Sequence, residues 1–243
     1  MNATQRFLFL VLFAPLSFSF LDAQLVLTPV SNPASLSNFL AGQGVTISNV
    51  SMNCPQNSAG TFDGTNSNIG IGNGLVLSTG AVNDLNGPNG SGNTSGDMSA
   101  MGDTDFDALT GFQTFDACVL EFDAVPSANN IQFNYVFGSE EYPEFVNSNF
   151  NDGFAIWISG PGITGNQNVA YLPNSATTVT VDNVNSGNNS QHFVNNGDGT
   201  VAPQNTDSTV VQLDGFTVNI TVSVAVQANQ SYHFKIGVAD AGD

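Results

Sequence analysis

Carboxylates placed at the ends of expected strands are the residues of this sequence best suited to chemistry. Glu140 and Glu141 come directly after one apolar alternating run, and Asp152 comes just before the next. Because the loops of a β-sandwich cluster at its two ends, acids at strand ends are expected to meet at one rim. The candidate metal ligands are Glu140, Glu141, Asp152, Asp105, Asp107 and Asp240.

Calcium is the ion that such a rim suits. It binds six to eight oxygen ligands from carboxylates, carbonyls and water in flexible geometry, whereas zinc prefers His and Cys. Two carboxylates about 4 Å apart repel by roughly 4 kcal/mol at an effective dielectric constant near 20. For Glu140, Glu141 and Asp152 we therefore expect a calcium site. For residues 103–107 the alternative, solvated charges that keep the protein soluble, is equally open.

Seven short apolar runs, separated by Asn-, Gly-, Ser- and Thr-rich turns, must position these acids. Alternation, β-branched residues and turn signals at this spacing predict strands. The runs cover residues 74–79, 118–122, 131–137, 154–158, 177–181, 216–224 and 232–238. We expect an all-β fold, a jelly-roll-like antiparallel β-sandwich with long Asn/Gly-rich loops. One short N-terminal helix is expected over residues 33–41, and residues 83–101 are expected to form a long loop.

The first 23 residues have the pattern of a secretory signal peptide. Arg6 precedes a short apolar run that ends near Ala23 and Gln24, where cleavage is expected. The run is too short to span a bilayer, and no later segment is apolar enough to do so. We therefore expect residues 24–243 to form one secreted or cell-surface domain.

The charge of that domain excludes several classes of partner. Lys235 is its only lysine or arginine, against 19 of the chain's 20 acidic residues. Such a chain cannot neutralise phosphates, so we expect no nucleic-acid binding, and anionic membranes would repel it. Cys54 and Cys118 both lie in the exported part and form a candidate disulfide pair.

Two alternative functions remain open beside a non-catalytic module. A carbohydrate-binding module would use aromatic side chains, for which Tyr142 and Tyr171 are better placed than Trp157, which the pattern puts in the core. A secreted glycoside hydrolase would need a carboxylate pair such as Glu140 and Glu144. No nucleophile stands beside either histidine, so we expect no enzyme, and the sequence indicates neither the partner (a glycan or a surface protein) nor the oligomeric state.

Several uncommon strings occur in one order along the chain. They are NYVFGSEEYPEFV at residues 134–146, FNDGF at 150–154, GLVLSTG at 74–80, DACVLEFD at 116–123, SGPG at 159–162, VDNVN at 181–185, DGFT at 214–217 and YHFKIGVADAGD at 232–243. On these strings the sequence resembles the choice-of-anchor L domain of secreted and surface bacterial proteins, common among Bacteroidota.

The resemblance implies a surface module with an adhesion or matrix role. Members of this family are followed by varied surface-sorting signals, such as that of the type IX secretion system. They usually continue beyond the final Ala-Gly-Asp into a further strand, so we expect the domain of residues 24–243 to lack its C-terminal end.

Overall fold

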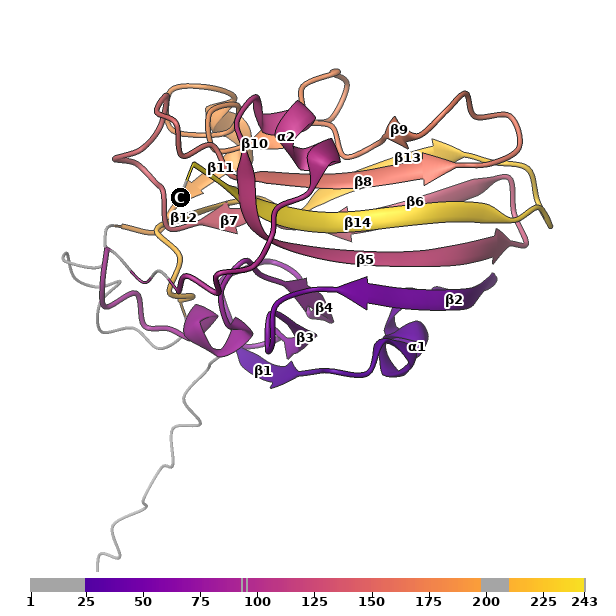
Figure 1. The fold of residues 1–243 in the computed structure, drawn as a ribbon, viewed down its shortest axis with the longest axis horizontal. Helices are drawn as coiled ribbons and strands as arrows, with labels where there is room; N and C mark the ends of the chain where they lie inside the picture. The colour runs from indigo at the N-terminus through magenta and orange to yellow at the C-terminus, as the bar shows by residue number, and fades with distance from the viewer. Residues whose placement is uncertain (1–24, 93, 95, 198–209, 243) are drawn as a thin grey trace, which may run out of the picture.

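The computed structural model describes residues 25–92, 94, 96–197 and 210–242. The expected signal peptide and its cleavage position at Ala23 lie outside the described residues. The described part is mostly β, with fourteen strands in antiparallel sheets that pack as an open sandwich (Figure 1). The predicted fold class is therefore confirmed.

The largest sheet, called here the main sheet, has the strand order β10-β8-β14-β5-β2, and β9 adds to β8 (Figure 1). Its strands are β2 (Val45–Asn53), β5 (Thr114–Pro126), β8 (Gly153–Ser159), β9 (Gln167–Asn168), β10 (Val179–Thr180) and β14 (Tyr232–Ala241). Ile236 of β14 stands between Leu120 of β5 and Ile156 of β8. Because side chains alternate along a strand, such residues form one apolar inner face.

Shorter strands form the layers that pack against this face. Strand β6 (Asn130–Tyr135) pairs with β13 (Ile220–Ala225), while β12 (Gly215–Thr217) pairs with both β7 (Gly138–Ser139) and β11 (Phe193–Asn195). A further sheet has the order β1-β3-β4, with bounds Val26–Pro29, Ala59–Asp63 and Asn73–Leu77.

The expected N-terminal helix is present as the 3₁₀ turn η1 (Pro33–Leu36) followed by α1 (Ser37–Leu40). Two other 3₁₀ turns are η2 (Val82–Leu85) and η3 (Ser190–His192). A second helix, α2 (Thr104–Thr110), was not expected. The Asp103 side chain accepts a hydrogen bond from the Asp105 N–H, and Gly111 ends the helix with φ 83°; both are standard helix boundaries.

The core lies between the main sheet and the shorter strands. Leu120, Phe122 and Phe234 are almost fully buried there, and the Phe122 and Phe234 rings stack with centroids 5.3 Å apart. A smaller cluster lies on the outer face, where Phe106 of α2 meets Trp157 edge to face at 4.8 Å. Trp157 is thus buried, as its apolar neighbours predicted.

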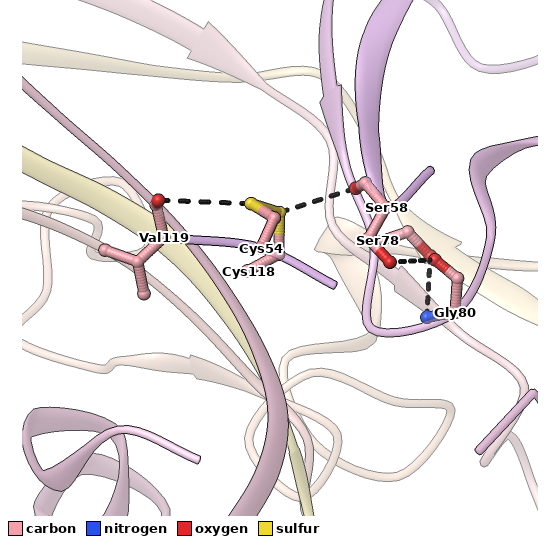
Figure 2. Close-up of a disulfide and its surroundings, with 6 residues drawn as sticks. All are labelled: Cys54, Ser58, Ser78, Gly80, Cys118 and Val119. Carbon is pink, nitrogen blue, oxygen red and sulfur yellow. Dashed lines mark hydrogen bonds between the residues drawn. A yellow bond between two sulfur atoms is a disulfide. The ribbon is translucent and has the colours of Figure 1, made fainter. Parts of the chain in front are cut away.

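A disulfide joins Cys54 to Cys118 (Figure 2). Cys54 directly follows β2, and Cys118 lies in the neighbouring strand β5. The bond closes a loop across a sequence separation of 64 residues. The Cys118 sulfur also lies 3.4 Å from the Ser58 carbonyl oxygen, next to the start of β3 (Figure 2). The bond therefore holds the edge strand β2 to the main sheet close to the β1-β3-β4 sheet.

Candidate functional site

Asp152 ties together three segments at one end of the sandwich. Its Oδ2 accepts a hydrogen bond from the Ser139 hydroxyl at 2.9 Å, and its Oδ1 accepts one from the Ala241 N–H at 3.1 Å. Ser139 ends β7, Asp152 directly precedes β8, and Ala241 ends β14. The acids at these strand ends are therefore brought to one rim, as the sequence suggested for this group.

The Glu140 carboxyl group at the rim has a strongly perturbed pKa. Its Oε2 lies 3.5 Å from the Thr94 N–H, and its Oε1 is buried without a hydrogen-bond partner. Burial raises the pKa of Glu140 to about 8, and the negative charge of Asp214 adds to the increase. A carboxyl group with such a pKa is mostly protonated at neutral pH unless a cation joins it.

Asp214 is a residue that sequence reasoning missed. It is fully buried just before β12, and its Oδ1 accepts a hydrogen bond from the Asn89 side chain at 2.8 Å. Pairing of Gly215 with Ser139 places Asp214 near Glu140. This pairing joins positions far apart in the sequence, and no local pattern indicates it.

A cavity of about 750 Å³ opens at this rim and extends along the inner face of the main sheet. Four of the six predicted metal ligands line it, namely Glu140, Glu141, Asp152 and Asp240. Most of its remaining lining is apolar, including Leu120, Phe122, Phe133, Ile156, Phe234 and Ile236. The cavity is thus apolar along its length and acidic at one end.

Asp105 and Asp107 lie elsewhere. Lys235 lies 2.6 Å from Asp105 and 2.8 Å from Asp103, and its ammonium group stands 5.2 Å from the Trp157 ring centroid. Asp107 instead accepts hydrogen bonds from the N–H and the hydroxyl of Thr114, both at 2.7 Å. Lys235 alternates along β14 with the cavity-lining Phe234 and Ile236, so this cluster is on the opposite face of the sheet.

The side chains of Ser139, Glu140 and Asp152 offer oxygen donors at the rim. Among the described residues, no three His, Cys, Asp or Glu side chains gather closely enough to hold a metal ion by themselves. Calcium at the rim would therefore need carbonyl, amide or water oxygens beside any carboxylate, which is common for this ion.

The remaining sequence candidates are placed as follows. Tyr142 was proposed as a sugar-stacking residue, but it is buried and its hydroxyl donates to the Val184 carbonyl at 2.7 Å, so that proposal is wrong. Tyr171 is half-buried. Glu144 is exposed and does not line the cavity with Glu140.

His233 forms a surface cluster on the outer face of the main sheet. Its Nδ1 lies 2.9 Å from Asp123 and its Nε2 lies 3.0 Å from Glu121. Desolvation lowers the pKa of His233, but the hydrogen bonds to these two carboxylates outweigh it and leave the pKa raised. Both ring nitrogens are thus engaged in structural contacts.

The described fold is a β-rich module, an open sandwich of antiparallel sheets with carboxylates gathered at one rim. A family model for the choice-of-anchor L domain matches residues 28–243, so the chain belongs to this family. The domain is in general a non-enzymatic module of surface or secreted proteins. No characterised protein and no solved structure matched the chain. Within the described residues, no helix is both long and apolar enough to cross a membrane.

Proposed function

We propose that this chain is a calcium-stabilised, non-catalytic module that contributes to adhesion or to a surface matrix. The observation that carries the calcium part is the buried Glu140 oxygen that has no hydrogen-bond partner, at a rim where Glu141, Asp152 and Asp240 also line the cavity. A divalent cation would offset both the burial and the like-charge repulsion at Glu140.

The protein's own cation does not reach this rim. Lys235 is the only lysine or arginine within the described residues, and it is held by Asp103 and Asp105 on the other face of the main sheet. Asp214 is fully buried and its negative charge raises the pKa of Glu140, so ionising Glu140 beside it is costly. An added cation would stabilise both carboxylates in their ionised form.

A thermal-shift experiment tests the calcium proposal. Binding with a dissociation constant of about 0.1 mM would add about 2 kcal/mol at 5 mM calcium, which corresponds to a rise in melting temperature of roughly 5 °C or more. Glu140→Gln should lose this rise. Asp105→Asn, which changes a carboxylate on the opposite face, should keep it. Equal melting temperatures of the wild-type protein in calcium and in chelator would refute the proposal.

The adhesion role is tested separately by binding. Beads coated with the protein should be retained on bacterial cell surfaces or matrix more than beads coated with the heat-unfolded chain. A glycan array probed in calcium provides the other arm, because selective glycan binding would favour a carbohydrate-binding module instead. Retention no greater than that of the unfolded control would rule out the adhesion role.

A further inference from the structure

Two kinds of strand surface line the cavity: the face of the main sheet and the edges of shorter strands. The strands of the main sheet contribute alternate residues, as shown by Leu120, Phe122 and Ala124 of β5. In contrast, residues 73–81, which include β4, and residues 130–141, which include β6, line it without interruption. Since successive side chains of a strand point to opposite faces, only the edge of a strand can present every residue. The cavity therefore has a sheet face as its floor and strand edges as walls.

The hydrogen bonds show which backbone groups face the cavity from β6. Among named strands of the described chain, β6 pairs with β13 alone. The Val226 N–H donates to the Asn129 carbonyl at 3.1 Å, in register with this pairing. Because hydrogen-bonded and non-hydrogen-bonded pairs alternate in antiparallel strands, the N–H and C=O groups of Gln132 and Asn134 point away from β13.

The same alternation applies to β4, which ends its own sheet. The Ser78 N–H donates to the Ser58 carbonyl at 2.8 Å, and the Gly64 N–H donates to the Gly72 carbonyl at 2.7 Å. With the β3–β4 register, the backbone groups of Leu75 and Leu77 therefore point away from β3. Two strand edges thus present backbone donors and acceptors to one cavity.

These edges lack two residue types that commonly protect a strand edge from pairing. Within the described residues, neither β4 nor β6 contains a proline or a lysine, which natural proteins commonly place on exposed edges. The floor is also incompletely covered. Ile236 and Val238 remain only partly buried although β14 is an inner strand of the main sheet.

We propose that this cavity is an acceptor slot for one extended β-strand of a partner polypeptide, which pairs with the open edge of β6 and packs alternate apolar side chains on the floor. A sheet layer occupies roughly 160 Å³ per residue at standard strand and sheet spacings, so the cavity of about 750 Å³ holds roughly five residues. The strand carries a basic residue at the end beside Glu140 and Glu141, because that end of the slot is acidic.

Backbone pairing distinguishes this slot from a site for a small apolar molecule. Strand addition draws its affinity from main-chain hydrogen bonds and its specificity from pockets for alternate side chains.

The strand proposal does not depend on the calcium proposal, and peptide binding is measured both in calcium and in chelator. Absence of a calcium-dependent shift in melting temperature would therefore not affect the strand proposal. Absence of peptide binding would likewise not affect the calcium proposal.

The test uses a fluorescein-labelled ten-residue peptide in which valine alternates with threonine and each end carries a lysine. A second peptide has the same sequence with N-methyl groups on every second residue. Fluorescence polarisation should show saturable binding of the first peptide and at least tenfold weaker binding of the second, since N-methylation removes backbone donors and keeps the apolar side chains. Equal binding of both peptides, or binding of neither, would overturn the proposal.

Two matched variants place the binding on the proposed edge. Gln132→Pro removes the N–H of an exposed residue on the slot-facing edge of β6, and Ser223→Pro removes the N–H of an exposed residue on the outer edge of the partner strand β13. Peptide affinity should fall at least tenfold in the first variant and stay unchanged in the second, with both melting temperatures checked. A dimer that forms in the wild-type protein and is lost in Gln132→Pro would assign the edge to a second copy and overturn the proposal.

Discussion

Replacing Glu140 by glutamine should stabilise the calcium-free protein, and more so at pH 7 than at pH 5. The folded state raises the pKa of Glu140 from 4.5 to about 8, mainly through burial. Between these values the folded chain holds a proton that the unfolded chain has lost, so this group makes stability fall as pH rises from about 4.5 to 8. Glutamine has a similar shape and does not ionise.

The expected magnitude follows from the size of the shift. One pKa unit corresponds to about 1.4 kcal/mol, so ionisation of Glu140 in the unfolded chain costs the folded state about 3 kcal/mol at pH 7 and less than about 1 kcal/mol at pH 5. Urea unfolding in chelator at both pH values measures the difference between wild type and Glu140→Gln. Acids that do not interact with Glu140 contribute equally in the two proteins, so their contributions cancel.

Glu144→Gln is the control, because this side chain is exposed on the same loop. It should change stability little at either pH. The reasoning about Glu140 would be refuted if Glu140→Gln altered stability by the same amount at pH 5 and pH 7. Added calcium should reduce or reverse the advantage of glutamine, since only the carboxylate gains a cation.

Three further perturbations test the scaffold. Cys54→Ser with Cys118→Ser should lower stability by roughly 4 kcal/mol, as the loop length implies, and reductant should then no longer shift the urea midpoint. The raised pKa of His233 contributes stability that is present below about pH 6.5 and is lost as pH rises through the folded pKa, so His233→Gln should flatten this part of the stability profile. Asp116→Ala removes an acceptor of two backbone N–H bonds, at 2.7 and 2.6 Å, and should cost roughly 2–4 kcal/mol in thermal or urea unfolding. An effect no larger than that of the exposed Asp97→Ala would contradict the last expectation.

The sequence predicted well those strands whose apolar pattern continues without interruption along the strand. The alternation over residues 131–137 and the continuous apolar run over residues 154–158 match β6 and β8. Strand β2 was missed for a physical reason. Its register shifts between Ser48 and Ser51, and Asn49 has a φ of 54°, so the apolar positions change phase within the strand.

The positions of the acidic residues were also only partly predictable from the sequence. Glu140 and Asp152 flank one loop, so their proximity follows from the chain itself. Asp105 belongs to a helix that Asp103 caps, and its partner Lys235 lies 130 residues away along the chain. Pairings of this range depend on sheet order, which a single sequence does not express.

The central position of β14 determines when folding can be completed. Strands β5 and β8 are joined only through β14, which is the last strand of the described chain. When the chain becomes available from its N-terminus onward, the main sheet therefore cannot close until residues 232–241 are present, and contacts of this sequence range form slowly. A chain shortened to residue 231 should show no cooperative unfolding transition; a sharp transition would show that the sheet closes without its central strand. The topology thus makes closure of the main sheet depend on the last strand of the described chain.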